Sequence, residues 1–177
     1  MSRSALVARW SLVIVTAFIL QIGLVPQFPI FGVVGDLMVA VTLGAGLVGG
    51  AERGAIVGFW CGFLFDLVRP GALGVSSLAY CVCGFAVGLL AVSVLQFGRP
   101  VTIALMGAGS AVATLLFASI AQVFGEHTLT NPALWKIVGV VSLLNAIASP
   151  LVVWACRLAE GEHQPADAGP VAGVGGA

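Results

Sequence analysis

The chain has 177 residues, of which 60% are hydrophobic and only 8% are charged, and its mean hydropathy is +1.14. A soluble domain has about 25% charged residues, so this chain lacks the polar side chains needed to cover a globule in water. Lys and Arg together number 7, as do Asp and Glu, which excludes a basic surface of the kind that binds nucleic acid. The composition is that of an integral membrane protein.

Six apolar segments follow one another along the chain, and Pro or Gly residues separate them. Each is long enough for a helix that crosses all or most of a membrane. We therefore expect an all-α integral membrane protein, a compact bundle of about six transmembrane helices in residues 1–159. A cleaved signal peptide is the alternative for the first segment, but that segment is longer than a signal core and no small-x-small cleavage site follows it. The segments are residues 6–25, 32–50, 54–68, 73–95, 101–124 and 134–156.

The basic residues predict how the bundle is oriented. If the N-terminus is in the cytoplasm, five arginines lie on the cytoplasmic side, and only Arg69 and Lys136 lie outside. An excess of basic residues marks the cytoplasmic side, so both termini are expected there. Residues 160–177 are rich in Ala, Gly and Pro and have no apolar period, which predicts a disordered cytoplasmic tail. The five arginines are Arg3, Arg9, Arg53, Arg99 and Arg157.

Two acids flank a short turn at residues 49–54. Asp36 precedes the turn centre and Asp66 follows it, each by about fifteen residues, so both carboxylates are expected about 22 Å from the turn on neighbouring helices. Arg69 comes one helical turn after Asp66. A carboxylate at membrane depth costs about 2.5–3.5 kcal/mol unless it finds water or a partner. One interpretation is therefore a polar, ligand-contacting cluster of Asp36, Asp66 and Arg69 at the outer face. The other is structural: Asp36 caps the helix that follows it, and Asp66 holds the turn that follows it.

Small residues line one face of the third predicted helix. Gly54, Gly58 and Gly62 recur every four residues. In lipid, such a face lets helix backbones approach closely, and this packing supplies stability. Gly84 and Gly88 repeat the pattern on the next helix. We expect these five glycines to be packing positions, between helices or toward a partner.

No motif of catalysis or metal binding occurs in the sequence. The four cysteines lie in apolar runs, without the His or further Cys spacing of a zinc site, and we expect them to pack as small hydrophobic side chains. There is no Ser/His/Asp set, no phosphate-binding loop and no HExxH. We therefore expect no catalytic residue, no metal, no cofactor and no enzymatic activity.

About residues 35 to 90 resemble a known family. A Gly-Asp pair opens an apolar helix, a short Arg-bearing turn follows, and a glycine-spaced helix then ends in Asp-Leu before a Gly-containing turn and a Leu-Gly pair. This order is similar to that of the rod shape-determining protein MreD family, which often has Pro where this chain has Gly35. The rest of the chain matches the family in hydropathy alone. The landmarks, in order, are Gly35-Asp36, Asp66-Leu67 and Leu73-Gly74.

The resemblance implies a non-enzymatic membrane scaffold of the bacterial cell-elongation machinery, in the plasma (inner) membrane. Such a protein supports rod shape and lateral peptidoglycan synthesis through contacts with the bitopic MreC, with wall synthases and indirectly with the actin-like MreB. The family's fold is similar to that of the substrate-binding S-components of energy-coupling-factor transporters. A vitamin-binding S-component is therefore the alternative function. A substrate pocket normally combines aromatic walls with convergent polar groups, and this chain has a single tyrosine, which favours the scaffold.

Overall fold

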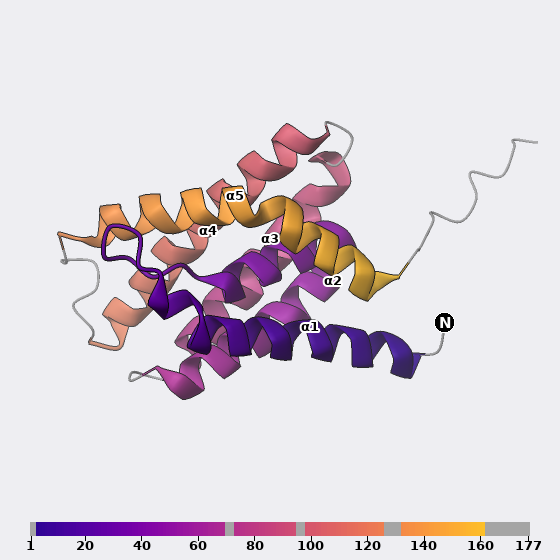
Figure 1. The fold of residues 1–177 in the computed structure, drawn as a ribbon, viewed down its shortest axis with the longest axis horizontal. Coiled ribbons are helices and arrows are strands. Elements are labelled where there is room, and N and C mark those ends of the chain that lie inside the picture. Colours follow the sequence, from indigo (N-terminus) through magenta and orange to yellow (C-terminus); the bar gives the residue numbers. More distant parts are fainter. Residues whose placement is uncertain (1–2, 70–72, 95–97, 126–131, 162–177) are drawn as a thin grey trace, which may run out of the picture.

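The computed structural model describes residues 3–69, 73–94, 98–125 and 132–161. Over these residues the chain is helical and has no strand, apart from an isolated bridge between Ile30 and Val33. The expectation of an all-α protein is therefore confirmed for the described part of the chain. The elements are α1 (Arg3–Gly23), the short 3-10 helix η1 (Val25–Gln27), α2 (Leu37–Val68), α3 (Val75–Val94), α4 (Arg99–Val123) and α5 (Leu134–Glu160) (Figure 1).

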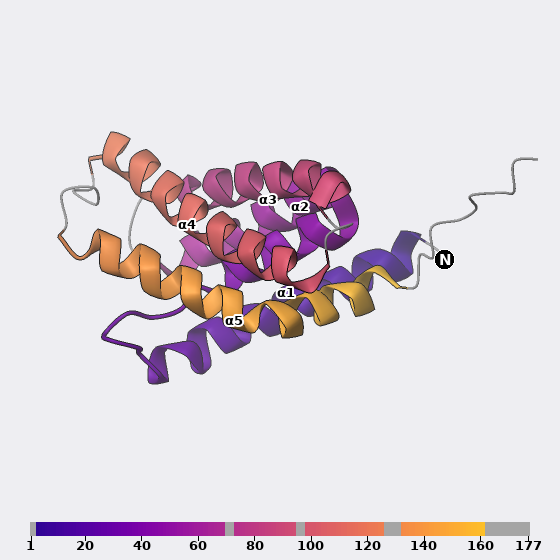
Figure 2. The same ribbon diagram turned by 90° about the horizontal axis from the view of Figure 1, so that it is seen from above.

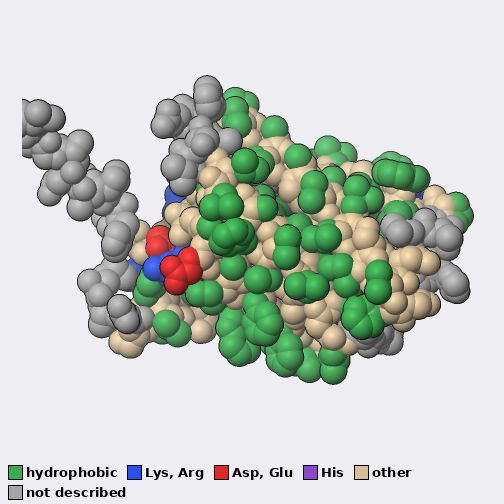
Figure 3. Space-filling view, turned by 180° about the vertical axis from the view of Figure 1, so that it is seen from behind, with side chains coloured by type: hydrophobic (Ala, Val, Ile, Leu, Met, Phe, Trp, Pro, Cys, Tyr) green, Lys and Arg blue, Asp and Glu red, His purple; other side chains and the backbone are tan. Residues whose placement is uncertain are grey.

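Three of the described helices are long and apolar enough to cross a membrane. They span Ser4–Gln27, Arg99–Val123 and Leu134–Glu160, and Val75–Ala91 is a shorter apolar helix. Many large apolar side chains point outward instead of into the bundle; Leu12 and Ile147, for example, are 68% and 67% exposed. Figure 3 shows hydrophobic side chains spread across one face, with most of the visible charged side chains at one end. These are the features of a helical membrane protein, because lipid replaces water around such a surface.

The turn between the second and third predicted helices is tighter than the sequence suggested. Instead of a loop at residues 49–54, the structure has one element, α2, broken at Gly50, where φ is 80° and ψ is −175°. Glycine adopts this conformation without the steric cost that a Cβ would add. The two arms of α2, residues 37–49 and 51–68, fold back on each other. Gly58 of the second arm lies so close to Thr42 of the first arm that a Cβ on Gly58 would be 2.8 Å from the Thr42 side chain. The first arm is about 20 Å long at 1.5 Å per residue, which is less than the hydrocarbon thickness of a membrane. The structure therefore does not establish six full-length spans.

The first arm of α2 forms the centre of the bundle. Every residue from 38 to 47 is buried, as expected for a helix that is apolar on all sides. α2 contacts all four other long helices, and its contact with α3 is the most extensive in the molecule. α1 and α5 cover one side of α2, and α3 covers the other (Figure 2). Because protein surrounds the first arm, it does not need to match the thickness of the membrane.

The helices define two ends of the bundle. At the end that we call the terminal end, Glu160 accepts a hydrogen bond from the indole nitrogen of Trp10 at 3.1 Å and pairs with Arg53 at 3.4 Å. These contacts join the first half of α1, the residues just after the Gly50 turn and the end of α5, on the right in Figure 1. The opposite end, where α2, α3 and α5 begin, is called the Asp36 end. The predicted tail from 160 onward begins within α5 at Glu160, and residues 162–177 lie outside the described part.

Candidate functional site at the Asp36 end of the bundle

Asp36 caps the first arm of α2 and binds a side chain of α3. Its Oδ1 accepts a hydrogen bond from the backbone N–H of Val39 at 3.0 Å, which is the N-cap geometry expected from the sequence. Its Oδ2 accepts a short hydrogen bond from the hydroxyl of Tyr80. The sequence did not predict this second partner. The bond with Tyr80 connects the start of α2 to the second turn of the adjacent α3.

Gln21 ties α1 to the same point. Its side-chain Nε2 donates to the carbonyl of Gly35 at 3.0 Å, and its Oε1 accepts from the backbone N–H of Leu37 at 2.7 Å. The N–H groups at the start of a helix have no partner within the helix, and Gln21 satisfies one of them. Gln21 is itself buried. It therefore fixes where α2 begins relative to α1.

Asp66 holds the beginning of α3. The side chain is 6% exposed, and its Oδ2 accepts hydrogen bonds from the backbone N–H groups of Gly74 at 2.8 Å, Ser76 at 3.1 Å and Ser77 at 3.3 Å. A carboxylate at this position satisfies unpaired N–H groups and lies beside the positive end of the helix dipole. Of the two interpretations of Asp66, the structure shows the one in which it holds the turn that follows. The intervening residues 70–72 lie outside the described part.

Arg69 does not join the two acids in one cluster. The residue ends α2 and is exposed, and its guanidinium carbon lies 4.5 Å from the ring centre of Phe117 on α4. Within the described ranges, Arg69 forms no ion pair with Asp36 or Asp66. The predicted polar cluster is therefore two separate arrangements: Asp66 is used by α3, while Asp36 and Arg69 face a shared cavity.

That cavity has a volume of about 200 Å³. Its polar lining comes from α1, from the start and end of α2, and from α3 and α4, and its remaining lining is mostly apolar. Small-molecule sites commonly have volumes of about 300–1,000 Å³, so this one is small. Most of its polar groups already bond to protein: Asp36 to Tyr80, Gln21 to the start of α2, and Thr114 to the carbonyl of Ser110 at 2.9 Å. The arrangement can hold water or a small polar molecule.

The predicted glycines lie where α2 and α3 approach most closely. Gly54 faces the backbone of Gly84, Gly58 faces the carbonyl of Tyr80, and Gly62 faces the backbone of Ser76. A Cβ on Gly62 would lie 2.5 Å from that backbone. On α3, Gly88 similarly faces the backbone of Ala51, just after the Gly50 break. All five glycines thus lie within the α2–α3 contact, so an external partner does not reach these faces.

Gln21 and Tyr80 are the site residues whose specific roles sequence reasoning missed. Both are polar residues within otherwise apolar helices, and such residues usually have a partner; the sequence could not indicate which. Another interhelical pair joins Asn145 of α5 to the hydroxyl of Ser110 on α4 at 2.9 Å. Among the described residues, no three His, Cys, Asp or Glu side chains come together in a way that could hold a metal ion.

No protein-family model, no curated protein and no solved structure matches this chain.

Proposed function

We propose that the chain is a membrane scaffold of the bacterial cell-elongation machinery, similar to the MreD family, and that it has no enzymatic activity. It supports rod shape and lateral peptidoglycan synthesis through helix contacts with a bitopic MreC-like protein and with wall synthases, and indirectly with MreB. The resemblance of residues 35 to 90 to that family is the starting point for the proposal.

One observation supports the proposal beyond the resemblance: the residues of the resembling motif pack α2 and α3 into one rigid unit. The glycine faces bring α2 and α3 into backbone contact, and Asp66 bonds the beginning of α3. The two carboxylates of the motif, Asp36 and Asp66, thus form their hydrogen bonds within the protein. Such a unit suits a scaffold, whose task is to hold an outer helical surface in a fixed shape for other membrane helices.

The distribution of basic residues supports an orientation. The helices bring Arg9, Arg53 and Arg157 to the terminal end, while Arg69 and Lys136 are at the Asp36 end. Basic residues accumulate on the cytoplasmic side of membrane proteins. In the proposed orientation the terminal end therefore faces the cytoplasm, where MreB filaments lie, and the Asp36 end faces outward, in a multi-pass protein of the plasma membrane.

The second candidate function is that of a vitamin-binding S-component. The cavity at the Asp36 end favours it, because Asp36, Arg69 and Tyr80 come from three places in the chain to line one space. Its volume of about 200 Å³ and the internal bonding of most of its polar groups weigh against a vitamin-sized ligand. We therefore rank the scaffold first.

Deletion of the gene in its bacterial host tests the proposal and separates the two functions. A scaffold of the elongation machinery predicts that cells widen and lose their rod shape on rich medium, and that the wild-type gene or a Gly139→Ala variant restores the shape. Gly139 is a suitable control because a Cβ there would meet no atom within 4 Å. Cells that keep their shape but require or fail to take up one vitamin would refute the scaffold and favour the S-component.

A further inference from the structure

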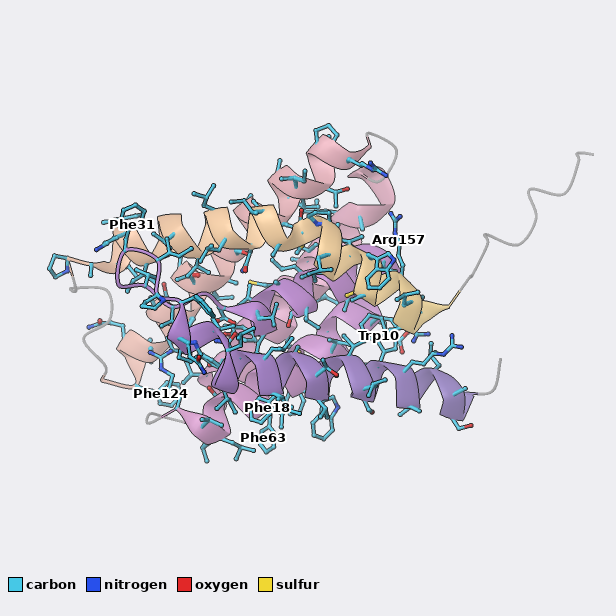
Figure 4. The ribbon with its side chains drawn as sticks, viewed as in Figure 1. Trp10, Phe18, Phe31, Phe63, Phe124 and Arg157 are labelled. Atoms are coloured by element: carbon cyan, nitrogen blue, oxygen red, sulfur yellow. The ribbon has the colours of Figure 1, made fainter. Side chains whose placement is uncertain are left out.

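A second cavity, of about 460 Å³, lies at the terminal end between the beginning of α4 and the second half of α5. Arg99 and Arg157 line it, and both are exposed; Figure 4 shows Arg157 toward the end of α5. The wall between α4 and α5 includes the apolar side chains of Ile103, Pro150 and Val153. The cavity is therefore cationic at its outer end and apolar along its wall.

Neither arginine at this outer end forms an ion pair within the described part of the protein. There, the ion pair that forms is between Arg53 and Glu160, and no acid pairs with Arg99 or Arg157. The first turn of α4 adds to the positive potential, because Gly98 precedes it and provides no side-chain cap. Pro100 has no N–H, so the N–H groups of Arg99 and Val101, together with the helix dipole, are what favour an anion here.

Ser149 supplies a second, independent indication of a ligand. It lines the same cavity and is 1% exposed, and its hydroxyl has no hydrogen-bond partner among the described residues. Buried polar side chains in native proteins almost always have a partner. Ser149 precedes Arg157 by eight positions, about 12 Å along α5. The cavity thus combines a cationic mouth with an unpaired hydroxyl deeper inside.

We propose that this cavity binds one anionic phospholipid. The phosphate lies between Arg99 and Arg157, an ester carbonyl accepts a hydrogen bond from the hydroxyl of Ser149, and an acyl chain follows the wall formed by Ile103 and Val153. Basic pockets between membrane helices are a common way to bind acidic head groups. A free phosphate would match the arginines but not the apolar wall or the depth of Ser149. This proposal does not depend on which proteins the chain contacts.

The half-exposed Trp154 supports a lipid as the occupant. Its indole lines the cavity three residues before Arg157 and is 59% exposed. Tryptophan is enriched where membrane helices meet the head-group region. An exposed tryptophan beside two arginines is thus the combination expected where the outer end of the cavity meets lipid head groups.

Native mass spectrometry of the full chain, released from phosphatidylcholine nanodiscs that contain a minor fraction of phosphatidylglycerol, tests the proposal. We expect one phosphatidylglycerol to stay bound per protein. Each arginine near an anionic lipid contributes about five-fold to binding, so the Arg99→Gln/Arg157→Gln variant should bind about 30-fold more weakly. A matched variant, Arg9→Gln/Lys136→Gln, loses the same charge at two exposed positions that line neither cavity, and should bind like the wild type. Ser149→Ala removes one hydrogen bond, worth about 1 kcal/mol, and should therefore weaken binding about five-fold.

Two results would overturn the proposal. In the first, phosphatidylglycerol binds the Arg99→Gln/Arg157→Gln variant as tightly as the matched variant, or is not preferred to phosphatidylcholine at all. In the second, millimolar inorganic phosphate displaces the bound phosphatidylglycerol, which would identify a site for free anions. Thermal unfolding of each variant checks that the exposed arginines can be replaced without loss of the fold.

Discussion

Replacing Gly58 with Ala tests the close approach of α2 and α3 with a single added methyl group. The new Cβ would lie 2.6 Å from the carbonyl oxygen of Tyr80 and 2.8 Å from the side chain of Thr42, whereas ordinary contacts begin at 3.4 Å. Relieving the contact with Tyr80 requires a shift of about 0.8 Å (3.4 less 2.6), and the atom in the way is backbone, which cannot rotate aside. Overpacking of this kind costs about 1–3 kcal/mol. Helices in a membrane generally form before they associate, so the higher helix propensity of Ala contributes little to the stability of the bundle.

We therefore expect Gly58→Ala to destabilise the bundle by about 2 kcal/mol, which corresponds to a Tm lower by about 4–8 °C for a chain of this size. Thermal unfolding in a mild detergent, followed by tryptophan fluorescence, measures this shift, because fluorescence reports the loss of helix packing even where helix content is unchanged. The matched control is Gly139→Ala in α5, where the added methyl group meets no atom within 4 Å and the change should stay within about 0.5 kcal/mol. Equal Tm values for the two variants would refute the close packing of α2 on α3.

Three further substitutions test the polar contacts. Asp66→Asn keeps the shape of the side chain but removes the charge that the N–H groups of α3 contact, and should lower the free energy of unfolding by about 2 kcal/mol. The same thermal assay measures this loss, and an unchanged Tm would mean that the carboxylate does not hold α3. Tyr80→Phe leaves an oxygen of Asp36 without its donor and should cost about 1–3 kcal/mol, whereas a stabilised variant would contradict the hydrogen bond. Glu160→Gln removes the partly exposed ion pair with Arg53 and should cost less than about 1 kcal/mol, so a larger loss would show that the pair is more important than its exposure suggests.

The fold could be predicted from the sequence to the extent that hydropathy determines it. The apolar segments gave the helices to within a few residues, and the Gly-spaced face indicated the close α2–α3 contact. The single-residue break at Gly50 could not be predicted, because several glycines in the turn could each adopt a positive φ. The burial of the whole first arm also could not be predicted, because an apolar helix in a membrane protein can face either lipid or protein.

The candidate site was predicted only in part, for a different reason. Depth along a helix placed Asp36 and Asp66 near one end of the bundle, and both acids lie there. Depth along a helix does not tell which way a side chain points, so the prediction from sequence wrongly placed the two acids in one cluster with Arg69. In the structure, Asp66 accepts hydrogen bonds from the N–H groups at the start of α3, and Arg69 lies over the ring of Phe117.

The identity of the proteins that bind this chain in its native membrane tests the proposed scaffold most directly. The measurement is an affinity purification of the full chain in a mild detergent, with co-purifying proteins identified by mass spectrometry and an unrelated membrane protein of similar abundance as control. A scaffold of the elongation machinery predicts recovery of a bitopic MreC-like protein and of elongation-specific wall synthases. Recovery of transporter ATPases with their coupling subunit would contradict it, and would make the cavity beside Asp36 a substrate site.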